Sequence, residues 1–330
     1  MNSGGQNNPK TTWKIVTLPR LQVDAIVSCF LLKYFGDEHF PGIKDNVEYH
    51  FLVNVPEGKD PIEMEKQGHI LLDMGGGKFD HHKDQDGVHD KCVSQLVAEY
   101  LGVQSDRPLK KLIDYAWRDD IKGKGTISED PIDRAFGLSG LINNLNRMLP
   151  DDQEMVLNTV MPLLLAHYLE EKKRAEDLPA EYKKQMDGGK VKITMVQGPR
   201  GSVKMVLIET DEIAMAGFLR ARREINADIV VQKMSSGHVN VVTQQKRMFD
   251  LSNIARLLRK KELQVKGEKS TLSDEELGAA GRVNGVDEWF FDTRARTIQN
   301  GGIRPQGTVP TRLSLLEIEN VIKEAAATKL

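Results

Sequence analysis

The sequence has few cysteines, no long apolar run and almost no net charge. Its only two cysteines, Cys29 and Cys92, lie in apolar helical patterns, which excludes a disulfide framework and favours a reducing compartment. No apolar run approaches the roughly 18 residues that a membrane span needs. The net charge of −2 excludes a protein that coats a polyanion over its whole surface. We therefore expect a cytoplasmic protein without a membrane anchor.

The first ten residues also lack the apolar core of a signal peptide. Residues 1–10 are rich in Gly, Asn and Ser, which predicts a disordered lead. The chain of 330 residues is too long for one ordinary core, so we expect two domains. A helical pattern with few breakers runs from 151 and closes at Gly188 and Gly189. We predict a first domain over 11–150, a helical linker over 151–188 and a second domain over 189–330.

Strand-like apolar runs alternate with helical patterns in the first domain. Connections between strands are long enough for helices, which is typical of a mostly parallel sheet covered on both faces. The predicted strands are 13–17, 47–53 and 70–72, and the predicted helices are 23–35, 92–101 and 109–118. In the second domain the predicted strands are 191–196, 203–208, 228–232 and 239–243, and the helices are 215–226, 249–261 and 313–323. The predicted fold class is α/β, with a smaller mixed-sheet α/β domain at the C-terminal end.

The most informative stretch is 70–83, which reads Ile-Leu-Leu-Asp-Met-Gly-Gly-Gly-Lys-Phe-Asp-His-His-Lys. A short apolar strand ends at Asp73, and three glycines then bring the chain round to Asp80, His81 and His82. Open α/β sheets hold functional groups at the carboxyl ends of their strands. Asp and His bind divalent cations in hydrolases, and glycines let the backbone pass close to a metal or phosphate. We predict a metal site here; the alternative is a polar surface turn.

Further acids stand near other predicted elements. Asp24 is at the beginning of the helix predicted over 23–35, where an acid interacts favourably with the helix dipole and needs no other role. Asp119 and Asp120 follow the helix predicted over 109–118.

These acids and the histidine pair together resemble the motifs of the DHH phosphoesterase superfamily. The short spacer between Asp73 and Asp80 is similar to the branch described as metal-dependent protein hydrolases, whose members are exonuclease-like. The resemblance covers most of the chain, and its motifs lie in 17–28, 70–83 and 112–123. It implies a DHH-type first domain whose parallel sheet holds two Mn²⁺ or Mg²⁺ ions.

The resemblance also implies roles for single residues. The implied metal ligands are Asp24, Asp73, His81 and Asp120, with Asp119 as the alternative to Asp120. His82 matches the histidine that faces the scissile phosphate; the alternative is a structural histidine.

The first motif departs from the family pattern. Leu18 and Gln22 stand where the family has a His and an Asp. One metal site would keep four ligands and the other only Asp73, because neither side chain is a good ligand. Arg20 or Lys83 would then supply the missing positive charge.

The second domain resembles the substrate-binding partner domain of the same superfamily. Arg247, preceded by Lys246, matches a segment that grips phosphate, whereas the glycine-rich His motif is not evident and His238 lies on another turn. Residues 241–269 hold eight Lys or Arg and three acids, a balance of 8 − 3 = +5. This is a local patch suited to phosphates, or an ordinary solvated surface. Asn300-Gly301-Gly302 lines the cleft or forms a simple loop.

Three functions follow from these expectations. The first is a Mn²⁺- or Mg²⁺-dependent, exonuclease-like phosphodiesterase. It would act on a short or single-stranded oligonucleotide, or on a nucleotide, in the inter-domain cleft. A homodimer is a possible assembly. Its catalytic residues would be Asp73, His82 and Arg20, with water made more acidic by the ion as the nucleophile. The second is a nucleotide-binding or regulatory protein with weak or no catalytic activity. This second function is favoured if Arg20 points outward. The third is a phosphatase of a small metabolite. The basic patch and the large second domain argue against this third function.

Overall fold

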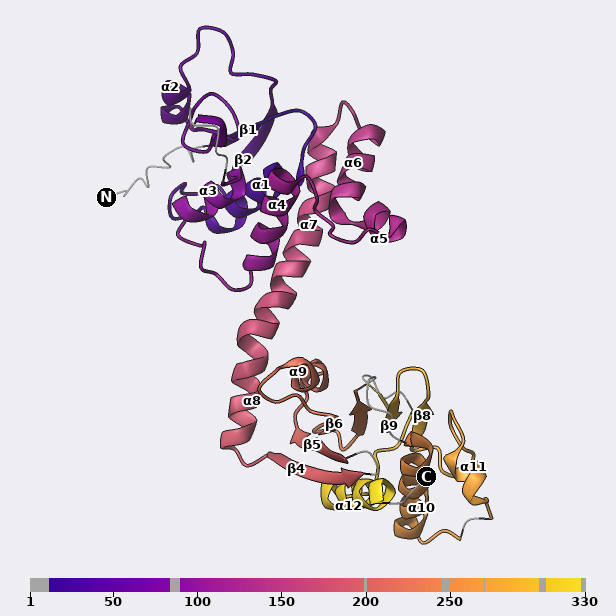
Figure 1. Ribbon diagram of the computed structural model, residues 1–330. Helices are drawn as coiled ribbons and strands as arrows, with labels where there is room; N and C mark the ends of the chain where they lie inside the picture. The colour runs from indigo at the N-terminus through magenta and orange to yellow at the C-terminus, as the bar shows by residue number, and fades with distance from the viewer. Residues whose placement is uncertain are drawn as a thin grey trace, which may run out of the picture. The chain divides into compact units, whose positions relative to one another are not determined.

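The computed structural model describes residues 12–83, 90–198, 201–244, 250–269, 271–302 and 307–327. The chain divides into two compact units, Met1–Ala175 and Glu176–Leu330. This division falls inside the stretch 151–188 that the sequence predicts as a linker. Each unit has its own sheet and its own hydrophobic core (Figure 1).

The first unit is built on a three-stranded parallel sheet. Its strands are β1 (Trp13–Thr17), β2 (Val47–Phe51) and β3 (His69–Leu71), in the order β2-β1-β3. Both neighbours run parallel to β1, so all three carboxyl ends lie at one edge of the sheet. The predicted strands and their parallel arrangement are confirmed, although β2 ends two residues before the predicted Val53.

The helices of this unit follow the predictions at first and then depart from them. They are α1 (Val23–Phe35), α2 (Pro61–Lys66), α3 (Val93–Tyr100), α4 (Lys110–Lys122), α5 (Pro131–Phe136), α6 (Leu138–Met148) and α7 (Gln153–Lys172), with a 3₁₀ turn, η1, at His81–Lys83. Helix α4 continues past Arg118 and ends at Gly123, whose φ of 61° is left-handed. Asp119 and Asp120 therefore lie in the last turn of α4 rather than after it. Helices α5 and α6 were not predicted.

Both faces of this sheet are covered, as predicted. Ile15 and Ile70 belong to the main core, which α1, α3, α4 and α7 complete. Val16 and Leu71 point to the other face and pack with Met64 of α2. Strands that are buried on both faces can offer polar groups only at their ends, so the carboxyl edge is where this unit can hold a site.

The second unit contains a six-stranded mixed sheet. Its strands are β4 (Val191–Gly198), β5 (Gly201–Glu209), β6 (Ile229–Lys233), β7 (Val239–Thr243), β8 (Phe290–Asp292) and β9 (Thr297–Gln299), in the order β4-β5-β6-β7-β9-β8. Among the described strands of this sheet, only β5 and β6 pair in parallel. The α/β class and four predicted strands are confirmed, whereas β8 and β9 were not predicted.

The helical segments of the second unit begin with a π-helical turn at the division between the units. They are η2 (Lys173–Asp177), α8 (Leu178–Asp187), α9 (Met215–Ala221), α10 (Leu251–Lys266), α11 (Asp274–Gly278) and α12 (Leu315–Ala327). Helix α9 is shorter than the predicted 215–226 because Arg222 adopts an extended backbone. Among all described residues, no helix combines the length and apolarity required to cross a membrane.

Candidate metal centre

The loop that follows β3 carries the site, and its backbone is unusual at Asp73. Asp73 has a φ of 58°, a left-handed conformation that is costly for a residue with a side chain. Gly75 has a φ of 72°, and a Cβ at this position would lie 2.6 Å from a methyl of Val55. The Asp73 amide donates to the Phe79 carbonyl at 3.0 Å, which closes the loop. A glycine is therefore required at position 75, within the short spacer between Asp73 and Asp80.

Asp80 fixes the returning arm of this loop. Its carboxylate accepts hydrogen bonds from the amide of Gly76 at 2.7 Å and from the amide of His82 at 2.9 Å. The residue is 8% exposed. Asp80 therefore fixes the position at which the histidine pair begins, and its carboxylate oxygens stabilise the backbone of the loop.

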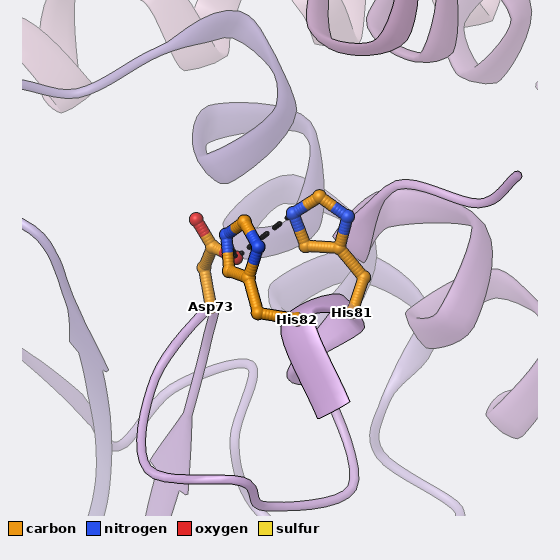
Figure 2. Close-up of side chains that lie close together, drawn as sticks. All are labelled: Asp73, His81 and His82. Atoms are coloured by element: carbon orange, nitrogen blue, oxygen red, sulfur yellow. Dashed lines mark ion pairs between the residues drawn. The ribbon is translucent and has the colours of Figure 1, made fainter. Parts of the chain in front are cut away.

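Asp73, His81 and His82 converge on one point at the carboxyl edge of the sheet. The Nε2 atoms of His81 and His82 lie 3.0 Å and 3.1 Å from Oδ1 of Asp73. Figure 2 shows the two imidazole rings side by side and directed toward the carboxylate. One ligand atom from each residue lies within 4.8 Å of the others. Two imidazole nitrogens and a carboxylate oxygen at this spacing suit a divalent transition metal such as Mn²⁺ or Zn²⁺.

The second nitrogen of His81 fixes the ring for this role. Nδ1 lies 3.0 Å from the carbonyl oxygen of Lys91, so it donates its proton there. In a neutral ring, Nε2 then presents a lone pair to the site, as in metal-bound histidines. His81 is 9% exposed in its side chain, whereas His82 is 59% exposed and open to solvent.

Two buried carboxylate oxygens at the site also fit a cation. Oδ1 of Asp73 and Oδ2 of Asp120 are buried, and apart from the imidazole nitrogens beside them they have no hydrogen-bond partner among the described residues. Burial raises the pKa of the Asp73 carboxyl, against the lowering effect of His81 and His82. Burial also raises the pKa of Asp120, to about 6, and the charge of Asp24 adds to that rise. A divalent ion would satisfy both oxygens and stabilise their ionised forms.

The structure separates the two adjacent acids of α4. Oδ2 of Asp120 lies 3.9 Å from Nε2 of His81. Oδ1 of Asp119 instead accepts the amide of Gly125 at 2.9 Å and holds the loop after α4. Of the two alternatives, Asp120 is the acid that lies at the site.

Asp24 lies beside the site but its carboxylate has another task. Its oxygens accept the amides of Val93 and Ser94, the first residues of α3, at 2.9 Å each. Asp24 is 5% exposed. Both oxygens therefore bind the first amides of α3. Asp24 also lies in the first turn of α1, as the sequence predicts. Asp24 can add a ligand atom only through its remaining lone pairs.

The segment after β1 forms the opposite wall of a small cavity. The cavity has a volume of about 40 Å³ and is lined by Thr17, Leu18, Arg20, Gln22, Asp24, Ala25, Leu72, Asp73, Val93 and Asp120. Arg20 has a φ of 79°. Its amide and that of Leu21 donate to Oε1 of Gln153 at 2.9 Å and 3.0 Å, so α7 holds the segment in place. Both Arg20 and Gln22 are exposed, and the Leu18 side chain contributes only carbon.

The other predicted substrate residues either lie outside the described residues or have structural partners. The Lys83 side chain, Lys246 and Arg247 lie outside the described residues. Asn300 is fully buried, and its amide donates to the carbonyls of Glu288 and Val309 and accepts the amide of Thr311. The expectation that Asn300 binds substrate is therefore corrected to a structural role. Gly301 and Gly302 follow it with positive φ and form a turn.

In the described part of the basic patch predicted over 241–269, most cations are buried or paired with acids. Arg259 is fully buried and donates to the carbonyls of Leu277, Ala279, Gly281 and Trp289. Four further cations pair with acids: Arg256 and Lys260 with Asp274, Lys261 with Glu317, and Lys266 with Glu268 and Glu288. Among the described residues, five of the eight cations counted in the +5 balance are therefore already buried or paired with acids.

Sequence reasoning missed two groups that shape the site. The Lys91 carbonyl orients His81, but a backbone carbonyl has no signature in a sequence. Gln153 was counted only as part of a helical stretch, although it is 5% exposed and binds the segment after β1. A lone glutamine at the beginning of a helix gives no signal for such a contact.

Comparisons with known proteins do not identify the chain. No family model matches it, and no curated protein matches it significantly. Among solved structures, it is similar to an uncharacterized protein from Helicobacter pylori G27, with 10% identity over 96% of this chain and 98% of that one, and a TM-score of 0.27. A TM-score this low supports no argument, so the function must be inferred from the site itself.

Proposed function

We propose that the first unit is a metal-dependent phosphodiester hydrolase of the DHH type, exonuclease-like, that acts on an oligonucleotide or nucleotide. The observation that carries the proposal is the convergence of His81 and His82 on Oδ1 of Asp73, at 3.0 Å and 3.1 Å. The motif resemblance and the parallel sheet whose carboxyl edge holds this group add support.

The chain's own residues would divide the work at this site. Asp73, His81 and Asp120 would hold an ion, Mn²⁺ or Mg²⁺ in the family, with His81 oriented by Lys91. A bound divalent ion lowers the pKa of water and neutralises phosphoryl charge. His82, whose ring is more exposed than that of His81, would contact the phosphoryl oxygens of the substrate.

We further propose that the site holds one ion. Donor atoms from His81, His82 and Asp120 gather around Asp73, and Asp73 and Asp120 line the cavity. The other wall carries Leu18, which has no donor atom, and the neutral Gln22. A second cation would lack ligands there, so Arg20 would have to supply positive charge during hydrolysis.

The exposure of Arg20 favours a second candidate function. Although it lines the cavity, Arg20 is an exposed residue. If it does not reach the substrate, the protein would bind a nucleotide or oligonucleotide without hydrolysing it.

Hydrolysis of a single-stranded oligonucleotide with a fluorescent end label tests both functions. We expect release of labelled nucleotide with Mn²⁺ and none with a chelator. Asp73→Ala and His82→Ala should reduce the rate by about 100-fold or more, as expected for metal-ligand and acid–base positions. His50→Ala, at an exposed histidine of β2 paired with Glu48, is the matched control and should keep full activity.

The outcomes separate the candidates. Binding of the oligonucleotide without metal-dependent release would reject the hydrolase and support the binding protein. Release that is unchanged in Asp73→Ala would show that another site, or a contaminant, is responsible. If the protein shows no binding and no release of the oligonucleotide, both functions are rejected.

A further inference from the structure

Thr17 is the last residue of β1 and lies next to the metal centre in the sheet. Val16 pairs with Leu71 in the parallel register of β1 and β3, so Thr17 is level with Leu72, the residue before Asp73. The carbonyl of Thr17 accepts the amide of Leu52 at 2.9 Å, so its backbone is fixed. The residue is 1% exposed.

The hydroxyl of Thr17 has no hydrogen-bond partner among the residues that the structure describes. A buried hydroxyl without a partner is destabilising, and proteins rarely keep one without a reason. Thr243 shows the usual arrangement, because it ends strand β7, is fully buried, and donates from Oγ1 to the Arg296 carbonyl at 3.0 Å. The two threonines share residue type, strand end and burial, and they differ in this one contact.

Thr17 also lines the cavity of about 40 Å³ that contains Asp24, Asp73 and Asp120. A water molecule needs roughly 10–15 Å³ of such space and two or more polar partners. The cavity therefore has room for a water molecule within the space that Thr17, Asp73 and Asp120 line.

We propose that the Thr17 hydroxyl is a positioning group that binds and orients a water molecule, or the substrate oxygen that replaces it, beside the metal centre. This rests on the proposed function of the site and adds a residue that the motif resemblance does not assign. A hydroxyl can donate one hydrogen bond and accept others, so it can hold an oxygen while leaving its lone pairs directed elsewhere. The branched side chain on a central strand has restricted rotation at χ1, so the position of the hydroxyl is well defined.

Three variants test this inference on the full chain. Thr17→Val replaces the hydroxyl by a methyl of the same shape, Thr17→Ser keeps the hydroxyl, and Thr243→Val removes a hydroxyl that has a protein partner. We expect Thr17→Val to melt at the parent Tm or above it, because no protein hydrogen bond is lost. Thr243→Val should melt below the parent. If Thr17→Val lowers the Tm as much as Thr243→Val does, the hydroxyl is structural and the inference is wrong.

A high-resolution crystal structure of the parent and of Thr17→Val gives a readout that needs no activity. In the parent we expect a water oxygen about 2.6–3.2 Å from Oγ1, and in Thr17→Val we expect it to be displaced. A Thr17 hydroxyl that contacts only protein atoms would overturn the inference.

Kinetics then separates this inference from the proposed function. We expect Thr17→Val to bind Mn²⁺ within about threefold of the parent and to lose about tenfold in kcat with little change in KM, and Thr17→Ser to recover most of the rate. Parent activity with unchanged kcat in Thr17→Val would reject the role of Thr17 and leave the hydrolase standing. No activity in the parent would reject the hydrolase, while the crystallographic water still decides the role of Thr17.

Discussion

Nδ1 of His81 donates a hydrogen bond to the backbone carbonyl of Lys91 at 3.0 Å. A carbonyl oxygen can only accept, so the proton of a neutral ring sits on Nδ1, and Nε2 carries a lone pair. That lone pair lies 3.0 Å from Oδ1 of Asp73, which also has lone pairs. Two acceptors at this distance repel each other unless a proton or a cation lies between them. A cation bound between these two atoms would therefore stabilise the arrangement.

Loss of either group of this pair should abolish metal binding. Mn²⁺ at 100 times its Kd should stabilise the parent by about 2.7 kcal/mol, which a thermal shift measures. We expect His81→Gln and Asp73→Asn to lose this shift. His50→Gln, at an exposed histidine, is the control and should keep it. A full shift in His81→Gln would contradict the assignment.

Replacing Asp119 or Asp120 of α4 by Asn should affect Mn²⁺ binding differently. Asp120→Asn removes a carboxylate 3.9 Å from His81 and should weaken Mn²⁺ binding by about 10- to 100-fold. Asp119→Asn alters the bond to the Gly125 amide and should lower the Tm with Mn²⁺ affinity unchanged. Isothermal titration of both variants measures this contrast, and equal losses of affinity would show that the acids are not distinguished.

The metal-free protein should lose stability as the pH rises through the range where Asp120 ionises. Burial raises the pKa of this carboxyl from 3.8 to about 6, so the folded state holds the proton more tightly than the unfolded chain. The resulting stabilisation is complete below about pH 4 and is lost as the pH rises through 6. Burial raises the pKa of Asp73 in the same direction.

Urea unfolding with a chelator present checks this pH dependence. Between pH 4 and pH 7, the free energy of unfolding of the parent should decrease by on the order of 1–2 kcal/mol more than that of Asp120→Asn. Mn²⁺ should remove the difference. A parent that gains stability over this range relative to Asp120→Asn would contradict the sign.

The local part of this site could be predicted from the sequence because one short loop contains it. A strand that ends at Asp73, a glycine turn and an adjacent histidine pair bring three ligands together within ten residues. Strands β1 to β7 and several of the longer helices were predictable from apolar periodicity, whereas β8, β9 and α6 were not. Asp120 could be proposed only through the family resemblance, because nothing in its own surroundings shows that α4 ends beside β3.

Other parts depended on tertiary contacts that residue types do not encode. Asp24 was expected to bind metal, yet its oxygens cap α3, whose beginning is 69 and 70 residues further along the chain. The charge of Arg259 was counted toward a surface patch, yet the side chain is fully buried among backbone carbonyls. Counts of charge measure composition and say nothing about which cations are already paired.

Asp24→Asn tests the capping role. The amide would present its NH₂ group to one of two backbone donors, Val93 or Ser94, and leave that N–H without a partner. We expect a loss of about 1–3 kcal/mol in the free energy of unfolding, measured by urea titration. Mn²⁺ should still bind with the parent stoichiometry. Complete loss of the ion in a stably folded Asp24→Asn would show instead that Asp24 is an essential ligand.

Restoring the first motif should create a second metal site. The double variant Leu18→His with Gln22→Asp adds an imidazole and a carboxylate to the wall that now lacks ligands. We expect the number of Mn²⁺ ions per chain, measured by equilibrium dialysis, to rise from about one to about two. An unchanged number would mean that this segment does not face the ion.

The most direct test of the metal centre is anomalous diffraction at the manganese edge from crystals of the parent soaked in Mn²⁺. The account predicts one peak per chain, about 2.0–2.3 Å from Nε2 of His81 and from a carboxylate oxygen of Asp73, and no such peak in Asp73→Asn. A parent crystal with no peak within coordination distance of these two atoms, at Mn²⁺ concentrations that saturate other proteins of this chemistry, would contradict it.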